Sequence, residues 1–199
     1  MNDARNAAAS DTRSQILRVA TSLIRTRSYL GFSFQDIADE IGIRKPSLYH
    51  HFPCKEALGV EVLRQATAAF EAWAATTPPA PRSKLTAYFS MYRNGLHAGR
   101  GVCPAGALAC GWDCIDAELR AAVRCLRDAQ ISWLNGVLSA IGMRGRKHAM
   151  RDTAACVFAA CQGALLSARM TGAVEDFDAA VAQVRAAVLA GATVQARSR

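Results

Sequence analysis

The sequence of 199 residues lacks the features of a membrane or exported protein. It has no uninterrupted apolar run near the ~20 residues that span a bilayer. Its first residues, MNDARNAAASDTR, lack the apolar core of a signal peptide. We therefore expect a soluble, cytoplasmic protein with no membrane partner.

Cysteine pairs of the CxxC type are also missing. The chain has seven cysteines, an odd number, and most of them fall in helix-like stretches. Thiols stay reduced in the cytoplasm, so a disulfide framework is not expected.

Patterns typical of catalysis are absent as well. We find no nucleophile–His–acid set, no phosphate-binding loop and no paired carboxylates. Only four histidines are present, and two of them, His50 and His51, lie in the motif described below. We expect no enzymatic activity, no cofactor and no metal site.

The formal net charge of +8 is compatible with a nucleic-acid partner but does not establish one. Residues 1–60 hold eight Lys/Arg and six Asp/Glu, a balance of only +2. Bulk charge is therefore a weak argument, and the placement of individual residues has to carry the interpretation.

Helical periodicity runs through the N-terminal part of the chain. Residues 1–10 are small and polar, and we expect them to be disordered. Asp11 or Thr12 then caps a helix that ends near Arg27. Its apolar positions recur at three- and four-residue spacing: Ile16, Leu17, Ala20, Leu23 and Ile24.

Two short helices and a long one follow. The first covers Phe34 to Ile41, with Ser33 as its cap, and the second covers Lys45 to Phe52. Gly42 lies between them, where glycine tolerates the positive φ of a turn. In the second helix Leu48 and Phe52, four residues apart, face the core. The long helix runs from Lys55 to about Ala75.

The remaining chain is predicted to be helical after a proline-rich boundary at residues 76–82, TTPPAPR. The predicted helices cover residues 83–98, 104–111, 116–141, 147–171 and 176–196. The fold class is all-α. We predict two helical domains, at residues 11–55 and 56–199.

The stretch SFQDIADEIGIRKPSLYHHFPCK, residues 33–55, reads as a helix-turn-helix whose second helix enters the major groove. It resembles the TetR/AcrR family of bacterial regulators. The matching elements are Phe34-x-x-Ile37-Ala38, Gly42-Ile43, Leu48-Tyr49-x-His51-Phe52 and Lys55-Glu56-x-Leu58. With the preceding helix, the resemblance covers about the first third of the chain.

This resemblance implies a homodimer that binds a palindromic operator on double-stranded DNA and usually represses transcription. It further implies that residues 11–55 form a helix-turn-helix DNA-binding domain and residues 56–199 a helical effector-binding and dimerisation domain, in which a small-molecule effector releases the DNA. Ser33, Tyr49, His50 and Lys55 would contact phosphates, while Arg44, Lys45 and Ser47 would approach base edges. Arg44 departs from the family, which often has a small capping residue there, and adds a side chain able to read guanine or bind phosphate.

The stretch GRGVCPAGALACGWDCIDAEL, residues 99–119, is rich in cysteine. It resembles a TetR subgroup with a Cys-x-x-Gly-x-Leu-Ala turn, although Gly111 and Trp112 stand where an acidic residue is expected. Its cysteines fit three roles. They can be small core residues, a thiol switch centred on Cys103 near Arg100, or metal ligands in which His97 or Cys103 joins Cys110 and Cys114. The spacing of Cys103, Cys110 and Cys114 is not a recognised zinc-binding pattern.

Aromatic residues on different helices of the C-terminal region could surround a cavity for a small, largely apolar ligand. Core packing is the simpler explanation for residues at helical spacing. The candidate effector-binding residues are Phe89, Tyr92, Cys103, Cys110, Trp112, Trp133 and Phe158.

The last two helices are predicted to form the dimer interface. Small residues in 152–170 permit close helix approach: Ala155, Ala159, Ala160, Gly163 and Ala164. Apolar residues in 176–194 form a stripe: Phe177, Val181, Val184 and Val188. Two such helices from each subunit would make a four-helix bundle; alternatively, they close the monomer core.

Besides a ligand-released repressor, three other functions remain open from sequence. They are a redox or electrophile sensor acting through Cys103, a helical adaptor that does not bind DNA, and an enzyme.

Overall fold

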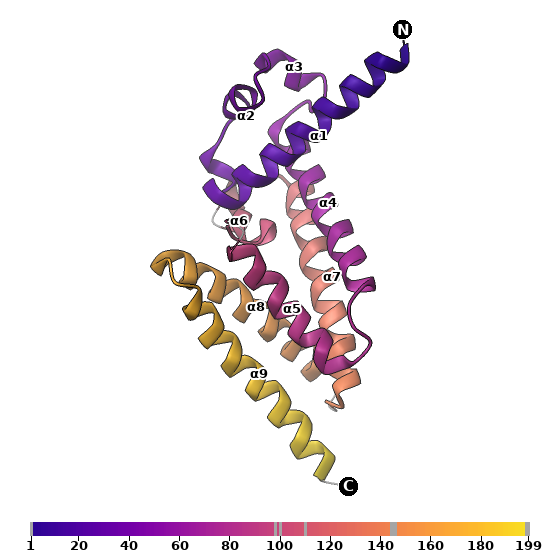
Figure 1. Cartoon of the computed structure of the whole chain (residues 1–199), viewed down its shortest axis with the longest axis vertical. Helices are drawn as coiled ribbons and strands as arrows, with labels where there is room; N and C mark the ends of the chain where they lie inside the picture. The colour runs from indigo at the N-terminus through magenta and orange to yellow at the C-terminus, as the bar shows by residue number, and fades with distance from the viewer. Residues whose placement is uncertain (1, 98, 100, 110, 144–146, 198–199) are drawn as a thin grey trace. The chain divides into compact units, whose positions relative to one another are not determined.

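The computed structural model describes residues 2–97, 99, 101–109, 111–143 and 147–197. Its elements, in chain order, are α1 (Asn2–Arg27), the 3-10 turn η1 (Tyr29–Gly31), α2 (Phe34–Ile41), α3 (Lys45–Tyr49), α4 (Lys55–Ala75), α5 (Pro81–His97), α6 (Pro104–Ala109), the 3-10 turn η2 (Trp112–Cys114), α7 (Ala117–Ile141), α8 (Lys147–Thr171) and α9 (Val174–Arg197). No strand occurs among these residues. The predicted all-α class is confirmed (Figure 1).

Helix α1 begins at Asn2, whereas the sequence suggested a disordered tail at 1–10 and a cap at Asp11 or Thr12. The alanines at 7–9 favour helix. Asp11 lies inside the helix, where its Oδ2 accepts a hydrogen bond from Gln15 Nε2 at 3.0 Å. The predicted apolar positions of this helix are all buried: Ile16, Leu17, Ala20, Leu23 and Ile24.

Helix α3 ends at Tyr49, three residues before the predicted end at Phe52. The N–H groups of His51 and Phe52 both donate to the carbonyl of Leu48 at 2.9 Å, which closes the helix in a turn. Pro53 follows, and a residue before proline is disfavoured in the helical region.

The chain divides into two compact units. The first holds the residues up to Thr67 together with Pro104–Leu126, and the second holds Ala68–Cys103 and the chain from Arg127 onward. These boundaries fall inside α4 and α7, so they differ from the predicted division between residues 55 and 56.

Packing within the first unit explains why α6 and the start of α7 belong to it. The Ser28 hydroxyl donates to the carbonyl of Ala107 at 3.0 Å. Gly59 of α4 lies so close to α7 that a Cβ there would come within 3.0 Å of the Leu119 side chain. Glycine therefore permits the approach of these two helices.

The second unit contains an antiparallel pair, α8 and α9, which lie side by side (Figure 1). Gly172 turns the chain between them with φ +75°, in the left-handed region that favours glycine. Arg93 of α5 is tied to Asp178 of α9 by a bidentate ion pair with N–O distances of 2.7 and 2.8 Å.

One stretch of the described chain, Met150–Thr171 of α8, is long and apolar enough to cross a bilayer by length and composition alone. Several of its side chains are buried inside the second unit: Ala154, Val157, Cys161, Ala164, Leu165 and Ala168. A core helix of a soluble protein passes the same test, and α8 fits that description.

Candidate nucleic-acid interface and interior site

Helix α2 is fixed at its start by a capping box. The Ser33 hydroxyl accepts hydrogen bonds from the N–H groups of Gln35 (3.2 Å) and Asp36 (3.4 Å), and Asp36 Oδ2 accepts from the Ser33 N–H at 2.7 Å. Side-chain and backbone hydrogen bonds from Ser33 lower the pKa of Asp36. Ser33, a predicted phosphate contact, is thus exposed and also serves as the helix cap.

The turn between α2 and α3 depends on Gly42, which adopts φ +78° and donates its N–H to the carbonyl of Ala38 at 2.9 Å. Arg44 then occupies the N-cap position of α3 with an extended backbone. Its side chain makes no capping hydrogen bond to the described residues. The guanidinium of Arg44 therefore does not cap α3, and this agrees with the sequence, which has arginine where the family often has a small capping residue.

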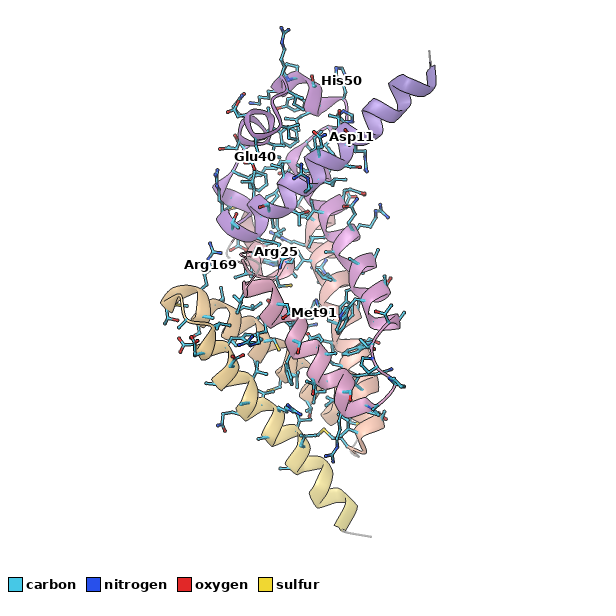
Figure 2. The ribbon with its side chains drawn as sticks, in the orientation of Figure 1. Asp11, Arg25, Glu40, His50, Met91 and Arg169 are labelled. Atoms are coloured by element: carbon cyan, nitrogen blue, oxygen red, sulfur yellow. The ribbon has the colours of Figure 1, made fainter. Side chains whose placement is uncertain are left out.

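Helix α3 has one buried and one exposed side. Leu48 is fully buried, and Phe52, just after the helix, is 3% exposed. The exposed side chains are Arg44, Lys45, Tyr49 and His50, with Ser47 half-buried. Figure 2 shows His50 at the end of this helix.

Tyr49 combines both environments. It is 51% exposed, yet its ring packs on Phe34 of α2 with the centroids 5.2 Å apart. This contact holds the phenol in place beside the exposed residues of α3 while leaving its edge accessible.

Lys55 is placed differently from the other predicted DNA contacts. Its ammonium donates to the carbonyls of Tyr29 (2.6 Å) and Phe32 (2.5 Å), and it lies 4.5 Å and 4.2 Å from the centroids of their rings. Burial lowers its pKa. Two of the three N–H donors of the ammonium therefore form hydrogen bonds within the first unit, where they join the start of α4 to the η1 region.

Arg13 of α1 was not among the predicted residues, although it contacts the segment just after α3. Its guanidinium lies 5.0 Å from the centre of the Phe52 ring and 3.4 Å from Glu61. Its side chain is 43% exposed. No sequence pattern signals this residue, because its proximity to Phe52 arises only when α1 packs on the segment after α3.

The second unit contains a buried polar network. Gln130 of α7 is only 3% exposed, and its Oε1 accepts hydrogen bonds from the hydroxyls of Tyr88 (3.0 Å) and Tyr92 (2.5 Å) of α5. Gln162 of α8 donates from Nε2 to the Tyr92 hydroxyl at 3.1 Å. We call these four residues the Gln130 network.

Both tyrosines of the Gln130 network remain neutral phenols. Burial is the main cause that raises the pKa of Tyr88 and of Tyr92 well above the ordinary value, and the nearby Cys103 and Cys161 thiols add to it. Cys161 is itself fully buried, and burial raises its pKa to about 12.

An aromatic group adjoins the network. Trp133 stacks on Tyr88 with centroids 5.7 Å apart, and it also contacts Phe70 (6.0 Å) and Trp73 (5.4 Å) of α4. Trp133 also lines a hollow of about 250 Å³. The other lining residues are Pro79, Pro81, Lys84, Ser132, Gly136, Val137 and Ala140.

The predicted effector residues are only partly brought together. Phe89, Tyr92, Cys103 and Trp133 lie in the second unit, where all but Trp133 are buried. Phe158 is half-buried on α8, and Trp112 lies in the first unit, with the Arg120 guanidinium 5.7 Å from its ring centre. Cys110 lies outside the described residues.

Tyr88, Gln130 and Gln162 were not predicted from the sequence to belong to this interior site. A signal for Gln130 was available, because it interrupts the apolar stripe of α7, whose other members are Val123, Leu126, Leu134 and Val137. A polar residue on the buried face of a helix needs partners in the interior. The identity of those partners could not be read from sequence.

The cysteines occupy mixed positions. Cys103 and Cys161 are buried, whereas Cys54, Cys114, Cys125 and Cys156 are exposed. Cys125 and Cys156 each fall on the outer side of their helix and are therefore not core residues. In the described part of the chain, no group of three or more His, Cys, Asp or Glu side chains could hold a metal ion.

Comparison with known proteins agrees with this architecture. Residues 16–62 match the model of the family described as "Bacterial regulatory proteins, tetR family". Over 55 residues the chain is 42% identical to the HTH-type transcriptional repressor KstR2 of Rhodococcus jostii (strain RHA1), a match that covers 28% of this chain and only 27% of that protein.

Similarity to solved structures extends over most of the chain. A TetR-family transcriptional regulator from Agrobacterium tumefaciens is 27% identical with a TM-score of 0.83, covering 89% of this chain and 97% of that one. A TetR transcriptional regulator from Legionella pneumophila is 26% identical with a TM-score of 0.79, covering 85% and 93%. The helix-turn-helix match and this whole-chain likeness lead to one conclusion: the chain belongs to the TetR family of bacterial transcriptional regulators.

Proposed function

We propose that this regulator binds a palindromic DNA operator as a homodimer, represses transcription, and releases the DNA when a small molecule binds its second unit. The observation that carries the proposal is the two-sided α3. Leu48 and Phe52 anchor this segment in the core, while Arg44, Lys45 and His50 are exposed on the other side. We assign its site of action to the cytoplasm, where the DNA is.

The exposed residues of α3 divide into two groups by their expected contacts. Arg44, Lys45 and Ser47, at the start of the helix, approach base edges in the major groove. Tyr49 and His50, together with Ser33 at the start of α2, contact phosphates and fix the register. Lys55 can add at most one further N–H to a phosphate, because two of its three donors bond Tyr29 and Phe32.

Dimerisation is supported by an unusual exposed stripe on α8. Its members are apolar or small and recur at three-four-three-four spacing: Cys156, Ala159, Gly163, Leu166 and Met170. Leu166 and Met170 are 45% and 81% exposed. This is the spacing of a helix seam that packs against another helix.

Three of the four α9 residues that spacing assigned to the interface, Phe177, Val181 and Val188, are buried within the second unit and close its core, and Val184 is half-buried. Exposed alanines recur along α9 at three- and four-residue spacing: Ala179, Ala182, Ala186 and Ala190. These alanines and the α8 stripe, paired with a second copy, would form the four-helix bundle.

Release by a small molecule is supported by the polar and aromatic interior of the second unit. Tyr92, Phe89 and Trp133, which sequence singled out, lie with the Gln130 network or its aromatic neighbours. A thiol sensor acting through Cys103 has less support, because this side chain is only 5% exposed and an oxidant would have to reach the interior.

A gel-shift titration tests the proposal, using the purified full-length protein and the DNA upstream of its own gene. Arg44→Ala and Lys45→Ala should change base preference, whereas Tyr49→Phe should weaken binding to every sequence. Arg127→Ala removes an exposed charge from α7 and serves as the matched control. Equal loss of affinity for operator and random DNA in all three α3 variants contradicts the division of contacts. Absence of specific retention contradicts the function and favours a helical adaptor.

A further inference from the structure

The Gln130 network has no evident structural purpose. Its four polar residues come from three helices of the second unit, α5, α7 and α8, in a region otherwise filled by apolar side chains. Within the described chain Gln130 is the only polar residue, tyrosine and cysteine aside, that is buried. Apolar side chains of similar shape would hold such a core at least as well, so the amide is available for a further use, recognition of a polar group on a ligand.

The groups in this network are all uncharged. Apart from burial, the side chains with the main influence on the pKa values of the two tyrosines are the tyrosines themselves and the thiols of Cys103 and Cys161, and none of these is a charged carboxylate, ammonium or guanidinium. The adjacent Arg93 is turned to Asp178 at the surface of α9. A carboxylate or ammonium brought to Gln130 would find no opposite charge, and burying an unpaired charge is strongly unfavourable.

Trp133 lies between this network and open space. One side of its indole stacks on Tyr88 at an interplanar angle of 26°, and the same residue forms part of the wall of the 250 Å³ hollow. The wall is mainly apolar and includes Pro79, Pro81 and Val137; its one charged side chain, Lys84, is not among the groups that bond to Gln130. A flat aromatic molecule suits such walls, and the hollow has room for about two fused rings.

We propose that the second unit binds an uncharged aromatic molecule bearing one hydroxyl group, which enters at the hollow, displaces Trp133 and replaces the Tyr88 hydroxyl as a hydrogen-bond donor to Gln130 Oε1. The Tyr88 hydroxyl would then donate to the Tyr92 oxygen, 3.4 Å away. The proposal rests on the proposed release by a small molecule and names its chemical class. Tyr92 is the second recognition residue, because its phenol already shares the same acceptor at 2.5 Å.

Equilibrium dialysis of the full-length protein at neutral pH tests the proposal with three probes of one shape: 2-naphthol, naphthalene and 2-naphthoate. We expect 2-naphthol to bind about tenfold more tightly than naphthalene, the effect of one buried hydrogen bond. The charged 2-naphthoate should bind more weakly still. Equal or tighter binding of 2-naphthoate overturns the proposal, and so does the absence of binding by 2-naphthol.

Two variants connect the preference to the network. Gln130→Leu removes the acceptor, and Tyr92→Phe removes one hydroxyl while keeping the shape of the ring. We expect Gln130→Leu to reduce the preference for 2-naphthol to about twofold or less. Gln65→Leu makes the same change at an exposed position of α4 and should keep the full preference. An unchanged preference in Gln130→Leu refutes the assignment; should this variant fail to fold, an unchanged preference in Tyr92→Phe refutes it equally.

The dialysis contains no DNA, so its result is independent of the gel shift. Operator binding without 2-naphthol binding contradicts the ligand site and supports the regulator. Preferential 2-naphthol binding without operator binding supports the ligand site and contradicts the regulator.

Discussion

Lys55 provides a direct test, because the sequence and the structure predict different roles for its ammonium group. Sequence similarity makes it a phosphate contact, while the structure bonds its ammonium to the carbonyls of Tyr29 and Phe32. Lys55→Met keeps most of the aliphatic stem and removes only the charged donor. Two charge-assisted hydrogen bonds in a half-buried place are together worth about 3 kcal/mol.

We expect Lys55→Met to lower the free energy of unfolding by about that amount. For a chain of this size, each 1 kcal/mol shifts the melting temperature by about 2–4 °C. The melting temperature should therefore fall by about 6–12 °C. Thermal and urea unfolding followed by circular dichroism measure both quantities.

Lys45→Met is the matched control, since Lys45 is exposed at the start of α3. It should leave stability within about 0.5 kcal/mol of wild type. The reasoning is refuted when Lys55→Met is as stable as wild type and instead lowers the slope of log affinity against log salt by about one unit, the signature of a lost phosphate contact.

Three other predictions concern stability and assembly. Ser33→Ala should destabilise α2 by about 1 kcal/mol in urea unfolding at neutral pH. The folded-state pKa of Asp36 lies below its ordinary value, so the stability that its carboxylate adds is present above the ordinary value and is lost as pH falls through the folded-state pKa. The difference in free energy of unfolding between wild type and Ser33→Ala should therefore shrink in acid, and a difference that does not shrink contradicts the capping box. Gly42→Ala should cost about 1–2 kcal/mol because of φ +78°. Gly136→Ala should stabilise by about 0.5–1 kcal/mol, because a Cβ added there in α7 would meet no described atom within 4 Å apart from its own helix backbone and chain neighbours. The opposite order of the two glycine variants refutes the role of the turn. Gly163→Arg should convert the proposed dimer to monomers in light scattering; an unchanged dimer mass contradicts the proposed α8 interface.

The DNA-binding half was readable from sequence because its signals are local. Ser33, Gly42 and Pro46 are cap, turn and first-turn residues that act through their own backbone neighbourhood. Leu48 and Phe52 could be assigned to the core by spacing alone. Lys55 could not be assigned, because its partners Tyr29 and Phe32 lie more than twenty positions earlier.

The interior site was less readable because it is assembled from distant helices. Spacing placed Tyr92 on a buried face, but its hydroxyl donates to Gln130 Oε1, 38 residues away, and this partner could not be identified from sequence. The α9 stripe shows a different limit. Periodicity identified Phe177, Val181 and Val188 as a buried face but could not distinguish the monomer core from a dimer interface.

The central claim, that α3 reads a palindromic operator in a dimer, is tested most directly by selection from a random pool of duplex DNA with the full-length protein. The account predicts enrichment of an inverted repeat whose half-sites are separated by about one helical turn, 10–10.5 base pairs from centre to centre, or a multiple of it. It also predicts loss of this enrichment with Arg44→Ala combined with Lys45→Ala. Failure to enrich any sequence, or the same inverted repeat recovered by the double variant, would contradict it.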